Sequence, residues 1–445
     1  PWTGARNALV AGASCPQLGG PLSDVPRNTY NDVIGDEDCL TLNVWTPRHT
    51  PAELDELAEP YPVMVWIHGG GNTIGTANIY DGSLLAGGEN VVVVTINYRL
   101  GYFGWMSHPA LRGEGVSAAD ASGNYGVLDM IAALEWVRDN IAGFGGDPEN
   151  VTIFGESAGG RNVYALMSSP MAAGLFHRAI AQSGRTSSTP LWRAENYRDD
   201  ELPGMDSSSR EWLLQQLQVA GEAADRPGAR AALESMPDSA IREFMYTRSP
   251  DQVLEGVRGL AGMYPCPQSI RDGAVLPQQS QMDQMRVPAQ YNAVPLMTGT
   301  TRDETKLFLA QSPTYVERRF GFLPRIRDLD AYNRAAAYGT DHWKASAVDE
   351  VAAVISEHGG EPVFAYRWDW DEGATTWLVD YAQLIGAGHG MEVAFVFGSF
   401  DGSMLLPGFY NDENVPGRDE LSRQMRSYWS EFARSGDPGR GREGD

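Results

Sequence analysis

The most constraining feature of this sequence is a serine that lies among small residues, between a strand-like run and a helical pattern. Residues 151–154 are mostly apolar without alternation, as is typical of a strand buried on both faces of a parallel sheet, and they lead directly into Gly155-Glu156-Ser157-Ala158-Gly159. Residues 162–168 then have a helical pattern. A strand that turns into a helix at one residue pushes that side chain out of the sheet and leaves no space for large neighbours. We therefore expect Ser157 to be a nucleophile.

Further apolar runs predict a mostly parallel sheet with helices on both faces. These strand-like runs occupy residues 40–45, 63–68, 91–98, 178–182, 295–299 and 362–368. Between the third strand and the serine motif, residues 130–141 carry apolar side chains at helical spacing, which predicts a right-handed β-α-β crossover. Helical stripes recur at 348–355 and 421–432, with Gly436 as a stop signal. The pattern indicates the α/β class.

The chain is predicted to form one domain of residues 1–445 that carries two inserted segments. Residues 186–271 are acidic and rich in Ser, Gln and Arg, and we interpret them as a cap on the sheet. A second segment, at about 310–358, is predicted to be helical. No linker-like composition separates either segment, so neither is expected to be an independent domain.

Charge and composition exclude several classes of partner. The 445 residues include 34 Lys plus Arg against 58 Asp plus Glu, and the formal net charge of -24 repels nucleic acid and anionic membrane surfaces. No apolar run is long enough for a membrane span. The 3 cysteines are too few for a disulfide scaffold and are spaced wrongly for a zinc site. We therefore expect no nucleic-acid partner, no integral membrane segment and no metal.

A serine hydroxyl needs a base, and on this kind of sheet the base follows the nucleophile and the acid in the chain. His342, His358 and His389 are far enough downstream. His358 ends a helical pattern, where a basic group is stabilised by the helix C-terminus, and His342 fits a surface position before a helix. His389 lies in the glycine-rich loop Gly386-Ala387-Gly388-His389-Gly390, from which an imidazole can project into a cleft. We prefer His389 as the base.

The acid that orients this base is expected in the loop after the strand at 295–299. Asp303 and Glu304 both lie there. Either carboxylate could instead be stabilised by the N-terminus of the helix that follows. Position in the sequence does not choose between them.

Taken together, these motifs belong to an ordered set that covers nearly the whole chain. The chain resembles the type-B carboxylesterase family, the branch of the α/β-hydrolases that also contains cholinesterases and bile-salt lipases. The matching segments are "CPQ" at 15–17, "EDCLTLNVWTP" at 37–47, "VMVWIHGGG" at 63–71, "VVVVTINYRLGYFG" at 91–104, "GNYGVLDM" at 123–130, "NIAGFGGDPENVTIFGESAGG" at 140–160, "LFHRAIAQSG" at 175–184, "DGAVLP" at 272–277, "GTTRDE" at 299–304 and "GAGHGMEVAFVFG" at 386–398.

The resemblance implies roles for individual residues and requires no metal or organic cofactor. At the matching positions these roles are nucleophile for Ser157, acid for Glu304 (in preference to Asp303), base for His389, oxyanion hole for the backbone of Gly70, Gly71 and Ala158, support of the acid for Ser183, and a structural buried carboxylate for Glu156.

The resemblance also implies a disulfide between Cys15 and Cys39, which leaves Cys266 as a lone thiol. Such a bridge closes a loop of about 25 residues and is worth roughly 3 kcal/mol in the chain-entropy model. Because disulfides persist in oxidising compartments, a secreted or periplasmic location is expected, with a cytoplasmic location as the alternative.

The sequence departs from the family pattern in places that bear on the termini and the substrate. A hairpin and a "GIPYA"-like segment normally precede the first residues, and a strand and helix normally follow "FARSGDP", so both ends are expected to be truncated. Asn72 stands where the family usually has a large apolar residue, which predicts a polar pocket wall. Residues 16–38 lack the tryptophan that binds choline in cholinesterases, and the cap lacks a long apolar helix for lipid interfaces.

The predicted function is therefore a serine carboxylesterase that acts on small-molecule esters of short to medium size, as a monomer or homodimer. An alternative is a specialised esterase for a polar polycarboxylate, polyester or carbamate, to which Arg161 and Arg302 are relevant if they line the pocket. We favour salt bridges of these arginines with nearby carboxylates instead. A second alternative is a non-catalytic cholinesterase-like binding module. The intact set of Ser157, Glu304 and His389 argues against the second alternative.

Overall fold

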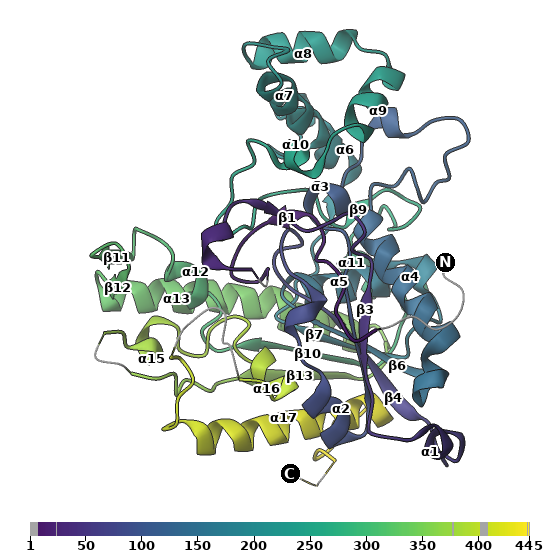
Figure 1. Cartoon of the computed structure of the whole chain (residues 1–445), viewed down its shortest axis with the longest axis vertical. Helices are drawn as coiled ribbons and strands as arrows, with labels where there is room; N and C mark the ends of the chain where they lie inside the picture. The colour runs from purple at the N-terminus through teal and green to yellow at the C-terminus, as the bar shows by residue number, and fades with distance from the viewer. Residues whose placement is uncertain (1–7, 24, 376–377, 401–407, 443, 445) are drawn as a thin grey trace.

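A central sheet forms the body of the molecule, and the computed structural model describes residues 8–23, 25–375, 378–400, 408–442 and 444 (Figure 1). Within these residues the large sheet has seven strands in the order β13-β10-β7-β6-β4-β5-β3. Only β3 is antiparallel to its neighbour, β5. The strands are β3 Leu42–Trp45, β4 Tyr61–Ile67, β5 Val92–Ile96, β6 Gly146–Glu156, β7 Arg178–Gln182, β10 Leu296–Thr301 and β13 Val363–Trp368. The predicted α/β class and mostly parallel sheet are confirmed.

The central strands are apolar on both faces because helices cover both faces. Val63, Val65 and Ile67 of β4 pack into one apolar cluster with α4 (Tyr125–Asn140) and α5 (Ala158–Ser168). The intervening Met64 and Trp66 pack into a second cluster with the long helix α17 (Val415–Ser435). Side chains of a strand alternate between its faces, so two apolar covers require an unbroken apolar run.

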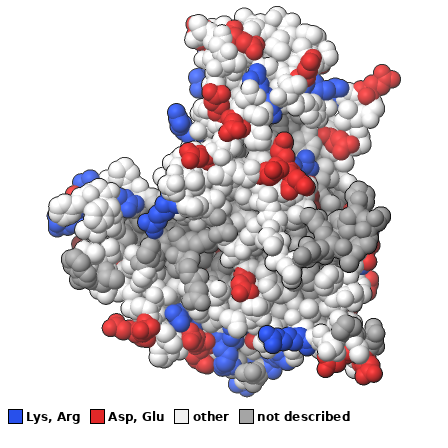
Figure 2. Space-filling model, in the orientation of Figure 1, with Lys and Arg blue, Asp and Glu red and all other residues white. Residues whose placement is uncertain are grey.

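The chain between β7 and β10 includes a helical lobe that stands beyond the sheet (Figure 1). Its helices are α6 Leu191–Glu195, α7 Ser209–Val219, α8 Arg226–Ser235, α9 Asp238–Tyr246 and α10 Pro250–Leu254. Trp212, Leu217 and Leu233 of the lobe belong to a third apolar cluster, which also includes Leu18 and Tyr102 from earlier in the chain. On the face shown in Figure 2, acidic side chains are scattered over this lobe and along the edges of the molecule.

The segment expected to be helical from about residue 310 differs from that expectation. It begins with a two-stranded hairpin, β11 Val316–Arg319 and β12 Leu323–Ile326. Helix α13 (Leu329–Lys344) follows, and a π-helical turn, Ala345–Asp349, joins it to α14 (Glu350–Glu357). The two four-residue strands are Val-Glu-Arg-Arg and Leu-Pro-Arg-Ile, which lack a sustained apolar–polar alternation, so no period-two pattern predicts the hairpin.

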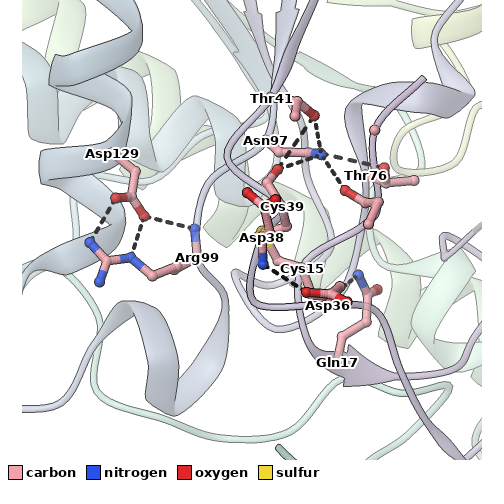
Figure 3. Close-up of a disulfide and its surroundings, with 12 residues drawn as sticks. Cys15, Gln17, Asp36, Asp38, Cys39, Thr41, Thr76, Asn97, Arg99 and Asp129 are labelled. Carbon is pink, nitrogen blue, oxygen red and sulfur yellow. Dashed lines mark hydrogen bonds and ion pairs between the residues drawn. A yellow bond between two sulfur atoms is a disulfide. The ribbon is translucent and has the colours of Figure 1, made fainter. Parts of the chain in front are cut away.

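A disulfide joins Cys15 and Cys39, as the resemblance implied (Figure 3). Cys266 is a buried free thiol. The loop it closes is tied to the sheet, because Asn97 Nδ2 donates to the Cys39 carbonyl at 3.1 Å. Gln17, beside the bridge, exchanges hydrogen bonds of 2.8 and 2.9 Å with the backbone of Gly75. The disulfide loop therefore supports the end of the glycine-rich loop that follows β4.

Within the described residues, no helix has both the length and the apolar character needed to cross a membrane.

Candidate active site

The turn between β6 and α5 places Ser157 at the carboxyl edge of the sheet. Ser157 has φ 58° and ψ -115°, a strained conformation for a residue with a side chain. The flanking glycines are required by space: a Cβ on Gly155 would lie 2.6 Å from the Ile67 carbonyl oxygen, and one on Gly159 would collide with the same atom. The two glycines of the Gly-X-Ser-X-Gly pattern are therefore needed because this turn lies directly against β4.

Glu304 and His389 meet beside this turn. His389 Nδ1 donates to Glu304 Oε2 at 2.5 Å. The other carboxylate oxygen accepts hydrogen bonds from Ser183 Oγ at 2.5 Å and from the Thr301 N–H at 2.8 Å. Glu304 is completely buried, so these three hydrogen bonds, and not bulk water, stabilise its carboxylate.

The neighbouring candidates lie elsewhere. Asp303 pairs with Arg302 and Lys306 at 2.9 and 3.1 Å. His358 Nδ1 bonds the Val354 carbonyl at 2.9 Å, at the end of α14, where the sequence predicted a helix C-terminus. Of the two carboxylates that position left open, Glu304 is therefore the one in contact with His389.

Glu156 contacts the same imidazole from the other side. Its Oε1 lies 3.1 Å from His389 Nε2, a contact that the sequence did not predict. Burial raises the pKa of Glu156 to about 7, against the opposing effect of His389. Burial alone would lower the pKa of His389, but the charges of Glu156 and Glu304 outweigh it and raise the pKa to about 9.

The glycine-rich loop after β4 lies against the serine turn. Gly70 and Gly71 have φ values of 97° and 66°, which favour glycine, and both line one cavity with Ser157. Ala158 is the first residue of α5, so its N–H has no partner within the helix. The loop, the helix start and the serine therefore share the edge at which parallel sheets bind ligands.

Asn72 does not lie where the sequence expectation put it. Its side chain is fully buried and does not line the cavity. It exchanges amide hydrogen bonds with Asn162 of 2.8 and 3.1 Å, and it accepts one from Tyr98 Oη at 3.2 Å. With φ 60°, a conformation that Asn tolerates better than most residues, Asn72 stabilises the glycine-rich loop after β4. It does not form a polar wall of the cavity.

The cavity has a volume of about 460 Å³ and mainly apolar walls. Its lining includes Leu307, Phe308, Trp343, Met391 and Phe397. Phe308 and Trp343 also pack on the His389 ring, with centroids 5.2 and 4.8 Å away. No sequence motif marks these two aromatic residues: Phe308 lies in the short helix α12 (Lys306–Leu309) and Trp343 lies in α13.

The two arginines singled out from the sequence have different positions. Arg161 lines the cavity. Arg302 does not: it pairs with Asp303 and Asp371 at 2.9 and 2.7 Å at the surface.

Similar proteins are known that match nearly the whole chain. The profile of the Carboxylesterase family matches residues 1–322 and 327–444. A medium-chain fatty acyl-CoA hydrolase precursor of Anas platyrhynchos is 34% identical over 464 residues, covering 98% of this chain and 76% of the relative. Para-nitrobenzyl esterase of Bacillus subtilis (strain 168) is 31% identical over 458 residues, covering 98% of this chain and 81% of the relative.

A solved structure of a PNB esterase superimposes with a TM-score of 0.68 at 30% sequence identity, covering 96% of this chain and 80% of that chain. The chain therefore belongs to the carboxylesterase family, has the α/β-hydrolase fold and is a carboxylic ester hydrolase.

Proposed function

We propose that the protein hydrolyses carboxylic esters of short to medium size through an acyl-enzyme on Ser157. The observation that carries the proposal is the buried contact of Glu304 with His389 Nδ1, which leaves Nε2 as the nitrogen that can accept a proton next to the serine turn. Glu304 fixes the imidazole tautomer and stabilises the cation that forms when His389 is protonated.

Two half-reactions follow from this arrangement. Ser157 Oγ attacks the ester carbonyl carbon as its proton passes to His389, and the oxyanion accepts hydrogen bonds from the N–H groups of Gly70, Gly71 and Ala158. The carbon–oxygen bond to the alcohol then breaks, and the alcohol oxygen takes the proton from His389. Water repeats the sequence on the acyl-enzyme, which releases the acid and restores the serine.

The size of the substrate is inferred from the cavity. A volume of about 460 Å³ lies within the usual range for small-molecule sites, and the aromatic and aliphatic lining suits an apolar acyl or alcohol group. The disulfide supports an exported location, because thiols in reducing compartments seldom stay paired.

The proposal is tested with p-nitrophenyl butyrate. We expect steady release of p-nitrophenol by the intact protein, and loss of release in Ser157→Ala with an unchanged melting temperature. Intact mass spectrometry after treatment with an organophosphonate should show one adduct, mapped to Ser157. Equal release by both proteins, or an adduct elsewhere, would overturn the assignment.

A further inference from the structure

Arg161 lines the cavity and Arg185 packs on the cavity-lining Trp343, and neither has a carboxylate partner in the part of the chain that the structure describes, although the protein is strongly acidic. Acidic residues outnumber basic ones by 24, and most arginines of the cap pair with a carboxylate. Within the described residues, neither Arg161 nor Arg185 lies within 4.0 Å of a carboxylate oxygen, and the buried Nε atom of each has no hydrogen-bond partner.

The surroundings of Arg161 leave its charge uncompensated. Its Nη1 donates to the neutral amide of Gln268. The two ionisable groups nearby that would favour its charge are Cys266 and Tyr98, but burial raises the pKa of Cys266 to about 12 and that of Tyr98 well above its usual range. Both are therefore neutral at physiological pH. Burial lowers the pKa of Arg161, yet a guanidinium stays charged in proteins.

The carboxylates that face the same region are engaged elsewhere. Glu156 lies against His389, and Glu304 accepts hydrogen bonds from His389, Ser183 and Thr301. Asp81 lines the cavity but is an exposed residue. A partly buried cation without a counter-ion is costly unless a ligand supplies the charge.

The position of Arg161 relates it to the reacting atoms. Its N–H donates to the Ser157 carbonyl at 3.0 Å, so it lies one helical turn after the nucleophile, on the same side of α5, and it lines the catalytic cavity. Arg185 lies over the ring of Trp343, at 4.7 Å from the centroid, and Trp343 lines that cavity too. Burial lowers the pKa of both arginines; the charge of Arg185 lowers that of Arg161 further, whereas the charge of Glu304 raises that of Arg185.

We propose that Arg161, with Arg185 behind it, forms a subsite for a carboxylate on the substrate, so that the preferred esters are half-esters of dicarboxylic acids. This inference rests on the proposed ester hydrolysis at Ser157 and adds its substrate class. Arg161 binds the free carboxylate through its planar fork while the esterified carboxyl group lies at the nucleophile. Arg302, in its surface ion pairs, takes no part.

The test compares monoethyl glutarate with ethyl glutaramate, in which a neutral amide replaces the carboxylate, by measuring ethanol release. We expect Arg161→Met to lower kcat/KM for monoethyl glutarate by about 10- to 100-fold, mainly through KM, since hydrogen bonds to charged groups are of this strength. Hydrolysis of ethyl glutaramate should change less than about threefold. Arg161→Lys should recover part of the loss. Arg138→Met, which removes a charge from the pair with Asp139 at the surface, is the matched control.

Binding measured without turnover separates this inference from the proposed function. Calorimetry on Ser157→Ala should show that glutarate binds more tightly than glutaramide. The difference in affinity should vanish when Arg161→Met is added. Equal losses for both esters in Arg161→Met, or equal affinity for glutarate and glutaramide, would assign Arg161 a structural role and overturn the carboxylate subsite. Failure of the intact protein to hydrolyse p-nitrophenyl butyrate would overturn the esterase mechanism, while calorimetry still decides the subsite.

Discussion

Charged side chains hold together both the candidate triad and the inserted cap, but in opposite surroundings. Glu304 is completely buried and accepts hydrogen bonds from His389, Ser183 and Thr301. In the cap, Arg226 and Arg230 pair at 2.8 and 3.0 Å with Asp199, whose side chain is 51% exposed. Distances in the two regions are similar, so distance alone does not rank these contacts.

The difference teaches that burial sets the strength of a charged contact. Water screens the cap pairs, and the two long side chains lose rotamer freedom when they meet. Glu304 is completely buried, out of reach of bulk water, so removing one of its donors leaves a charge or a polar atom unsatisfied. Four substitutions probe this contrast, and their expected effects decrease from the triad to the cap.

Glu304→Gln should have the largest effect. It keeps the shape but removes the charge that stabilises the protonated imidazole, so we expect kcat to fall by about 1,000- to 10,000-fold on p-nitrophenyl butyrate. Asp303→Asn, one residue away and paired with Arg302 and Lys306, is the control and should lose less than about tenfold. A similar loss in both variants would contradict the assignment of Glu304 as the acid.

Ser183→Ala should have an intermediate effect. It deletes the 2.5 Å hydrogen bond to Glu304 but leaves the one from the Thr301 N–H, so the carboxylate keeps one donor on that oxygen. We expect kcat/KM to fall about tenfold, the strength of one hydrogen bond to a charge. Unchanged kinetics at an unchanged melting temperature would show that Ser183 does not support the acid.

Glu156→Gln should move the pH profile. Only neutral His389 accepts the serine proton, so kcat/KM rises with pH through the His389 pKa of about 9. The negative charge of Glu156 raises that pKa, and its removal lowers it, so the acid limb of the profile should move to lower pH. The measurement is kcat/KM from pH 6 to 10 in both proteins. An acid limb that keeps its position or moves to higher pH in Glu156→Gln would contradict the contact.

Arg230→Met should have the smallest effect. It removes contacts with Asp199, Asp200 and Glu234 in the cap, which water screens. We expect the melting temperature to change by less than about 2 °C and kcat/KM for p-nitrophenyl butyrate to stay the same. A large loss of stability would show that the cap pairs act as a cooperative network.

Much of the candidate site was predictable because its signals are local. The strand, the glycines and Ser157 are contiguous, and steric exclusion at that turn acts between near neighbours in the chain and β4. The hairpin at 316–326 was missed because its strands are only four residues long and lack apolar–polar alternation, within a segment that has helical stripes. Asn72 was misplaced because adjacency to two cavity-lining glycines does not say which way a side chain points at a positive φ.

The sequence by itself determined the strand–turn–helix at Ser157, the two-sided burial of the central strands, and the family's ordered motifs. Only the tertiary structure decided which side chains meet. It brought His389 to Glu304, 85 residues away, placed Glu156 on the imidazole, and put Arg161 in the cavity but Arg302 at the surface. Backbone geometry is set by neighbouring residues, whereas contacts between distant loops depend on how the whole sheet positions its edges.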